Sequence, residues 1–368
     1  MSDPSPNILV RVPGKLLLAG EYAVLAGAPG IVAAVERHLT CAARPAARFS
    51  IEGAGARWEE GGEVGVLTFA HEALRATRDY LAGHGRVLPP LALTIDDELR
   101  APDGKKLGLG GSACTCAAVV SAALASVGQS LDKPLVFKLA ATAHASAQKK
   151  QGSALDVAAA TYGGVLFTWR FEATPLVAAW KAGPVAFAMA VDRTEAPPVE
   201  RLREPPALLL VFSGKSASTP SLMKQIEAWA VKEPKGWAEF IAFSSAACDR
   251  LRKALRTCDD AAMREALEAA GEQLQVLGDR SATPVVTEEH RVVAEAARRF
   301  GCAAKVSGAG GGDSCVALGR PEAIEALERE LRGIAFLEAR GTLALRLAMD
   351  AAGATAVAGG GAPCGSGP

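Results

Sequence analysis

The chain has 368 residues, of which 49% are apolar and 22% charged, and its 40 Lys and Arg residues balance its 40 Asp and Glu residues. Partners such as long nucleic acids or anionic membranes usually select a net basic protein, so this balance argues against both as partners. At about 150 residues per domain, the length favours two domains, and the apolar content excludes intrinsic disorder for most of the chain.

The beginning of the chain and its cysteines favour a cytoplasmic protein. Residues 1–7 show no basic segment followed by an apolar one, and no apolar run approaches the ~18 residues that span a bilayer. The eight cysteines are scattered and include no C-x-x-C pair, unlike a disulfide framework or a zinc site. We therefore expect reduced thiols in a cytoplasmic protein. The sequence leaves open whether it is a monomer or a homodimer.

The first half of the chain mixes strand and helix signals. Residues 8–12 and 15–19 predict strands, and GAPG at 27–30 separates two apolar runs as a hairpin turn would. Residues 113–127, a run of small apolar side chains, and residues 134–151, which follow an aspartate, predict helices.

A proline-rich segment, RTEAPPVERLREPP at 193–206, separates this half from the rest. Its four prolines deny donors to a helix or a ladder, so the segment is interpreted as a connection and a candidate domain junction.

The second half predicts helices at 237–255, 260–277, 288–300 and 321–331, and strands at 208–212, 305–306, 315–318 and 343–349. Without regular βαβ alternation, this order favours the α+β class in two lobes. The expected domains are residues 1–200 and 201–350. Residues 351–368 are rich in Gly and Ala and poor in large apolar groups, and they predict a disordered tail.

A glycine-rich segment, KKLGLGGSACTC at 105–116, precedes the predicted helix of small residues. Its glycines allow close backbone approach to a ligand, and the N–H groups of the first helical turn attract anions, so phosphate is the expected occupant. The alternative is a plain turn before a buried helix, but this does not explain Lys105 and Lys106.

Two other phosphate motifs do not fit. Residues 108, 110 and 113 match G-x-G-x-x-A, but the charged segment DDELRAPDGKK before them does not form the buried strand of a dinucleotide fold. Residues 214–216 resemble the end of a Walker loop, yet Leu209 occupies the place of the required first glycine, which excludes a P-loop.

A second glycine cluster, KVSGAGGGDS at 305–314, lies between two apolar runs and begins with a cation, Lys305. Four glycines in the five residues 308–312 are costly to order merely to turn the chain. A flexible linker is the alternative, and the apolar flanks favour a tight loop between strands under a ligand.

Together with PGKLLLAGE at 13–21, the segments GLGGSA at 108–113 and KVSGAGGGD at 305–313 make the chain resemble the GHMP kinases. This resemblance implies an N-terminal ATP-binding lobe like ribosomal protein S5 domain 2 and a ferredoxin-like C-terminal lobe. Within the superfamily, the segments at 103–113, 144–164 and 212–219 (FSGKSAST) resemble phosphomevalonate kinases. The implied reaction converts ATP and 5-phosphomevalonate to ADP and 5-diphosphomevalonate, in the mevalonate route to isoprenoids.

Two departures and two alternatives accompany this resemblance. Gly111 stands where Ser is usual, and the stretch before Asp156 holds Ala145 and Ser146 where mevalonate kinases carry a metal-binding glutamate. The second departure disfavours a mevalonate kinase and leaves the metal ligands open. The alternatives are another GHMP kinase, acting on mevalonate, a mevalonate phosphate or a sugar, and a nucleotide-binding regulator without catalysis.

The resemblance implies that Lys15 and Asp156 are the catalytic residues. A phosphate acceptor has a second pKa of about 6 and is mostly ionised near neutral pH, so a cation between the two phosphates matters more than a strong base. We therefore expect Lys15 to bridge the phosphates and Asp156 to orient Lys15 or the acceptor. The plainer alternatives are a solvated lysine at a strand end and a carboxylate at a helix N-terminus.

The other implied contacts are with ATP, Mg²⁺ and a small phosphorylated acid. The expected ATP-binding residues are Lys106, Gly108, Leu109, Gly110, Gly111, Ser112 and Ala113. The expected acceptor-binding residues are Ser153, Lys215, Ser216, Ser218, Thr219, Gly308, Gly310 and Gly311. Ser112 is also the candidate Mg²⁺ ligand, a role compatible with helix capping. His144 and Gln148 lie four residues apart on one helical face, either supporting the site or forming a satisfied core pair.

Overall fold

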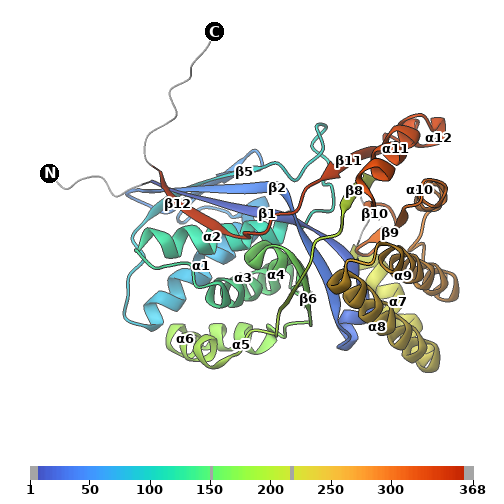
Figure 1. The fold of residues 1–368 in the computed structure, drawn as a ribbon. Coiled ribbons are helices and arrows are strands. Elements are labelled where there is room, and N and C mark those ends of the chain that lie inside the picture. Colours follow the sequence, from blue (N-terminus) through green and yellow to red (C-terminus); the bar gives the residue numbers. More distant parts are fainter. Residues whose placement is uncertain (1–6, 150–151, 216–218, 360–368) are drawn as a thin grey trace, which may run out of the picture.

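The computed structural model describes residues 7–149, 152–215 and 219–359 and has the expected mixed architecture of helices and strands around two sheets (Figure 1). Within these residues the larger sheet has eight strands, in the order β12-β1-β2-β5-β3-β4, with β6 paired to β2 and β7 paired to β6. Its strands are β1 Asn7–Ala19, β2 Gly30–Pro45, β3 Ser50–Gly53, β4 Ala56–Glu59, β5 Leu91–Asp97, β6 Val165–Thr168, β7 Glu200–Leu202 and β12 Thr355–Gly359.

Strand β1 replaces the two short strands expected at 8–12 and 15–19. Its register against β2 shifts between Pro13 and Gly14, so the chain passes the proline through an irregularity without leaving the sheet. The hairpin turn expected at 27–30 is also different. β1 and β2 are antiparallel neighbours, but a longer connection containing the 3-10 helix η1 Ala23–Ala26 joins them. Residues 27–29 of GAPG are only its last part, and Gly30 already belongs to β2.

Six α-helices accompany this sheet in the described part of the first lobe, besides η1 and the 3-10 helix η2 Gly65–Leu67: α1 Thr68–Gly83, α2 Gly111–Ser126, α3 Lys133–Gln148, α4 Leu155–Tyr162, α5 Thr174–Ala182 and α6 Pro184–Arg193. They lie on one side of it (Figure 1). α2 contacts β1, β2, α1 and α3, and its small buried side chains allow this close packing. α3 begins one residue before the predicted start at 134, because the Asp132 carboxylate accepts a hydrogen bond from the Leu135 N–H and Pro134 occupies the first turn, and it ends at Gln148, before the predicted end at 151.

The second lobe holds an antiparallel sheet whose four described strands run in the order β11-β8-β10-β9. They are β8 Ala207–Phe212, β9 Ala303–Ser307, β10 Ser314–Gly319 and β11 Leu343–Leu347. The helices are α7 Thr219–Lys232, α8 Pro234–Thr257, α9 Asp260–Ser281, α10 Glu288–Arg299, α11 Pro321–Arg332 and α12 Ala335–Glu338. This strand order is that of a ferredoxin-like lobe. The helices predicted at 237–255, 260–277, 288–300 and 321–331 are confirmed as α8 to α11, with slightly different ends.

The chain passes from the larger to the smaller sheet between β7 and β8, inside the proline-rich connection. The domain boundary at residues 200/201 stays a prediction, and β7 itself belongs to the first sheet. No helix in the described ranges is long and apolar enough to cross a membrane.

The expectation of a disordered tail at 351–368 is wrong for its first part. β12 pairs with the edge of β1, from Asn7 opposite Gly359 to Arg11 opposite Thr355 (Figure 1). The Asp350 carboxylate accepts hydrogen bonds of 2.8 Å from the N–H groups of residues 352 and 353, and Lys133 and Arg201 donate to backbone carbonyls of this turn. Backbone hydrogen bonds hold β12 in the sheet, so its small side chains did not indicate a strand in the sequence. Residues 360–368 lie outside the described residues.

Deletion of residues 355–368 should therefore reduce stability, because it removes a five-residue ladder from β1. At about 0.5–1.5 kcal/mol for each hydrogen bond, we expect a loss of ~2–4 kcal/mol in the free energy of unfolding. Urea denaturation monitored by circular dichroism measures it. Deletion of residues 360–368 alone is the matched control, and equal stability of the two truncated proteins would contradict the proposed role of β12.

Candidate active site

The three glycine-containing motifs meet around Gly108. The backbone N–H of Lys15 donates to the carbonyl of Leu109 at 2.9 Å, and the Lys15 ammonium donates to the carbonyl of Gly108 at 3.0 Å. From the other lobe, the Ser314 hydroxyl donates to the carbonyl of Leu107 at 2.9 Å. The loop before α2 is thus fastened both to β1 and to the start of β10.

Gly110 brings the two predicted catalytic residues together. Its φ is 80°, a left-handed conformation that favours glycine. A Cβ added there would lie 3.0 Å from Lys15 Cγ and 3.7 Å from Asp156 Cβ. The stem of Lys15 and the side chain of Asp156 therefore border the same short stretch of backbone, and a larger residue at 110 would press on the lysine.

The N-terminus of α2 follows directly, at Gly111, and its first turn holds no acidic residue. The N–H groups of the first turn have no partner within a helix and carry the positive end of its dipole, so this end suits a phosphate. Lys106 is exposed on the same loop, whereas Lys105 forms a 2.8 Å ion pair with Asp103. Of the two lysines, Lys106 is the better placed to contact an anion.

The side chain of Ser112 reaches His144, a contact that sequence reasoning missed. Ser112 Oγ and His144 Nε2 are 3.0 Å apart, and the same nitrogen lies 3.3 Å from Gln148 Nε2 and 4.0 Å from Asp156 Oδ2. Asp156 stands in the first turn of α4, and its Oδ1 accepts the N–H of Val157 at 3.0 Å. The spacing of His144 and Gln148 indicated a shared face, but no local pattern indicated Ser112 as the third member.

The loop between β9 and β10 is tight at two of its three predicted contact positions. A Cβ on Gly310 would lie 2.0 Å from the carbonyl oxygen of Val285, and one on Gly311 would lie 2.7 Å from Leu222 Cδ1. A Cβ on Gly308 would meet nothing within 4 Å. The strand-to-strand loop expected from the sequence is confirmed. The crowding, however, comes from the protein itself, and of these three glycines only Gly308 borders open space.

The segment before α7 lies beside this loop. The Asp313 N–H donates to the carbonyl of Lys215 at 2.7 Å, and the Ser213 N–H donates to the carbonyl of Asp313 at 2.8 Å. The Lys215 side chain is 69% exposed, with Nζ 3.7 Å from Glu289 Oε1. Ser216 and Ser218 lie outside the described residues, and Thr219 is the first residue of α7.

Ser153 stands just before α4, and its hydroxyl accepts a 3.4 Å hydrogen bond from the Leu155 N–H. It therefore lies near Asp156 in the chain, at the side of the site that α4 forms.

Two acidic side chains near the predicted residues are held in the ionised form. Burial raises the pKa of Glu289, but backbone donors, the neighbouring Thr287, the charge of Lys215 and the hydrogen bond from Arg340 outweigh burial, so that the pKa is lowered. Burial also raises the pKa of Glu72, but the neighbouring His71, the hydrogen bonds from Ser146 and Arg75 and the charge of Arg75 outweigh burial and lower the pKa to about 2. Glu72 accepts from Ser146 at 2.7 Å, so α1 supplies a carboxylate beside a position where the sequence showed none.

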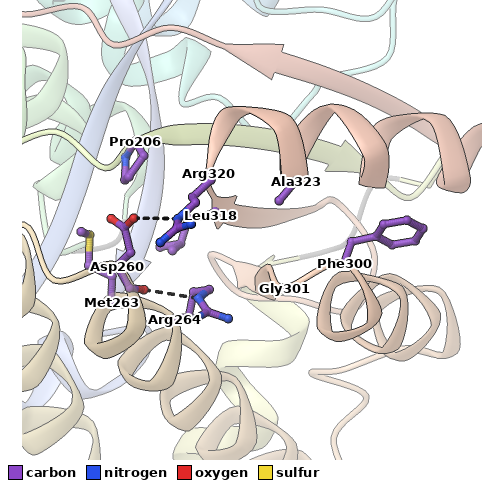
Figure 2. Close-up of a pocket in the computed structure, with 10 residues that line it drawn as sticks. Pro206, Asp260, Met263, Arg264, Phe300, Gly301, Leu318, Arg320 and Ala323 are labelled. Atoms are coloured by element: carbon purple, nitrogen blue, oxygen red, sulfur yellow. Dashed lines mark hydrogen bonds and ion pairs between the residues drawn. The ribbon is translucent and has the colours of Figure 1, made fainter.

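A cavity of about 350 Å³ lies elsewhere, in the second lobe, near the starts of α9 and α11 (Figure 2). Its lining includes Asp260 and Arg320, which form a 3.3 Å ion pair, and Phe300. It contains no predicted site residue, and it is not the candidate active site.

Comparisons with known proteins agree with the geometry. A model of the GHMP kinase N-terminal domain matches residues 68–164, and one of the GHMP kinase C-terminal domain matches residues 251–335. The chain is 32% identical over 355 residues to the phosphomevalonate kinase of Streptomyces sp. (strain CL190), which covers 86% of this chain and 91% of that protein.

Two solved structures are also similar. The Lin0012 protein from Listeria innocua has 28% identity and a TM-score of 0.84, with 96% of this chain and 100% of that one covered. Streptococcus pneumoniae phosphomevalonate kinase, solved in complex with phosphomevalonate and AMPPNP, has 23% identity and a TM-score of 0.80, with 93% and 99% covered. The second likeness concerns the fold alone. The three motifs, the site that they form and the sequence matches lead to one conclusion: the chain belongs to the GHMP kinase family.

Proposed function

We propose that this kinase transfers the γ-phosphoryl group of ATP to 5-phosphomevalonate, giving ADP and 5-diphosphomevalonate. The observation that carries the proposal is the placement of the Lys15 ammonium on the carbonyl of Gly108, across Gly110 from Asp156. The 32% identity over 355 residues to a phosphomevalonate kinase supports the choice of acceptor.

The residues of this chain mainly position and neutralise charge. Phosphoryl transfer between two polyanions requires in-line contact and cations around the transferred group. Lys15 supplies a fixed cation, and the N-terminus of α2 supplies N–H donors for the nucleotide phosphates. The acceptor phosphate is already ionised near neutral pH, so Asp156 orients Lys15 or the acceptor and need not take a proton.

The oxygen donors at the site fit Mg²⁺. Mg²⁺ prefers oxygen ligands and is usually held by one or two side chains together with substrate phosphates. The Ser112 hydroxyl and the Asp156 carboxylate are such donors, both within reach of His144 Nε2. The described residues contain no cluster of three His, Cys, Asp or Glu side chains that could hold a metal alone. When bound, Mg²⁺ would neutralise phosphate charge.

We assign the acceptor contacts to residues on both lobes. Ser153 from the first lobe and Lys215, Thr219 and Gly308 from the second are the proposed contacts, together with Ser216 and Ser218 of the same FSGKSAST segment. Gly310 and Gly311 allow the loop to fold tightly, since Val285 and Leu222 occupy the space that side chains at these two positions would need. The proposal includes a cytoplasmic location and a monomer or homodimer. The alternative acceptors are mevalonate, another mevalonate phosphate or a sugar.

An ADP-release assay with mevalonate, 5-phosphomevalonate and galactose tests the proposal, with products identified by ³¹P NMR. A site that binds the acceptor phosphate should reject the analogue lacking it, so we expect kcat/KM for 5-phosphomevalonate to exceed that for mevalonate by ~10³-fold or more. The product should retain its carboxylate. Equal or better turnover of mevalonate, or release of CO₂, would show that the acceptor or the reaction is wrongly assigned.

A further inference from the structure

Three helices meet at one nitrogen atom, Nε2 of His144. Ser112 belongs to the first turn of α2, His144 and Gln148 to α3, and Asp156 to the first turn of α4. Their distances to Nε2 are 3.0 Å for Ser112 Oγ, 3.3 Å for Gln148 Nε2 and 4.0 Å for Asp156 Oδ2. His144 is 6% exposed, and the Phe69 ring packs beside the imidazole with centroids 5.3 Å apart.

The hydrogen-bonding capacity of these groups limits their arrangement. A serine hydroxyl has one proton and two acceptor lone pairs, and a neutral imidazole has one N–H donor and one acceptor nitrogen. The amide nitrogen of Gln148 can only donate, and it points to the same Nε2 that faces Ser112. Nε2 is then the acceptor nitrogen, with the proton on Nδ1, and its single lone pair is shared by two donors, the Ser112 hydroxyl at 3.0 Å and the Gln148 amide at 3.3 Å.

We infer that His144 is a positioning residue whose Nε2 accepts the hydrogen bond of the Ser112 hydroxyl, so that the Ser112 oxygen faces the nucleotide site only as an acceptor. The inference rests on the proposed function. An oxygen whose only proton is engaged cannot donate to a phosphate, but it can bind a cation. Ser112 therefore acts on the nucleotide through Mg²⁺, and His144 acts through Ser112.

This arrangement separates His144 from an ordinary core histidine. A residue that only fills space would affect nucleotide binding with and without Mg²⁺ alike, and its effect would add to that of Ser112. A residue that orients the ligand oxygen should affect binding of the Mg²⁺ complex alone. Loss of a group that orients a metal ligand typically costs 10–100-fold in metal affinity.

Calorimetric titration of AMPPNP, with excess Mg²⁺ and with EDTA, tests the inference on the wild type, Ser112→Ala, His144→Phe and the double variant. Phenylalanine keeps a ring against Phe69 and removes Nε2. We expect His144→Phe to raise the Kd of the Mg²⁺ complex by about tenfold or more, and to leave the Kd in EDTA within about twofold. The double variant should bind no more weakly than Ser112→Ala, because the two residues act as a unit.

A second pair of variants keeps the test decisive if His144→Phe does not fold. The amide of His144→Gln reaches the position of Nε2 and can accept the proton, whereas that of His144→Asn ends near Nδ1. Glutamine should retain most of the Mg²⁺-dependent affinity and asparagine should lose it. His84→Phe is the control for the substitution, since the His84 side chain is 40% exposed and outside the site. Thermal unfolding of each variant checks folding.

The results that would contradict this inference differ from those that would contradict the proposed function. Losses that are equal in Mg²⁺ and EDTA, additive losses in the double variant, or equal affinities of the Gln and Asn variants would overturn the role of His144. Failure of the wild type to bind AMPPNP under any condition would instead overturn the proposed function.

Discussion

Replacement of Lys305 by methionine should lower the free energy of unfolding by about 3–5 kcal/mol, because it leaves the carboxylate of Glu21 buried without its partner. The two side chains form an ion pair in which Lys305 is 0% and Glu21 2% exposed. The ammonium also donates to the carbonyls of Val306 at 2.5 Å and Leu17 at 3.5 Å. Methionine preserves most of the length of the side chain, so the loss reports on charge and hydrogen bonds more than on volume.

Denaturation by urea of three variants measures this cost. Arg57→Met is the control, since the Arg57–Glu59 pair is 64% and 59% exposed and should contribute at most about 1 kcal/mol. The double variant Lys305→Met/Glu21→Gln should recover part of the stability, because it removes both charges from the interior. A Lys305→Met protein as stable as Arg57→Met would mean that water or another group compensates Glu21.

The buried pair also joins the two lobes, together with two hydrogen bonds between the same two segments of the chain. The Leu17 N–H donates to Ser307 Oγ at 2.9 Å, and the Tyr22 hydroxyl donates to the carbonyl of Ala309 at 2.5 Å. Glu21 and Lys305 stand within the first and third sequence motifs, and they fasten these motifs to each other. The sequence suggested that Lys305 is a cation beside a ligand. The structure corrects this, since the ammonium is fully buried against Glu21.

Local signals predicted the features whose causes are local. Asp132 and Pro134 fixed the start of α3, and the glycines before Ser112 marked a helix N-terminus. The contacts that complete the site are not local. Ser112 and His144 are 32 residues apart, and Lys305 and Glu21 are 284 apart, so only the folded chain reveals them. The sequence did not predict β12 for another reason. This segment lacks large apolar side chains, which suggested disorder, but the backbone hydrogen bonds that pair β12 with β1 do not require them.

Lys15→Met should reduce kcat far more than Asp156→Asn at saturating substrates. The Lys15 ammonium is held at the carbonyl of Gly108, where β1 and the loop before α2 meet. Removal of one preorganised electrostatic donor costs ~3 kcal/mol in the transition state, or about 10²-fold in rate. Asp156→Asn keeps the size of the side chain and one oxygen that can bind Mg²⁺, and an acceptor that is already ionised loses little without a base, so we expect a reduction of tenfold at most.

The comparison separates the two mechanisms because they depend differently on pH. If Asp156 only orients its neighbours, the slowing by Asp156→Asn should be similar across the neutral range, where the acceptor phosphate stays mostly dianionic. If Asp156 is a general base, its variant should be the slower of the two and its rate should recover as pH rises, since hydroxide replaces the missing base. Lys181→Met, on the exposed surface of α5, should keep the wild-type rate and is the control for the substitution of a lysine. Because Lys15 and Asp156 border the same glycine, a difference in their effects would reflect their chemistry and not their distance from the reacting phosphates.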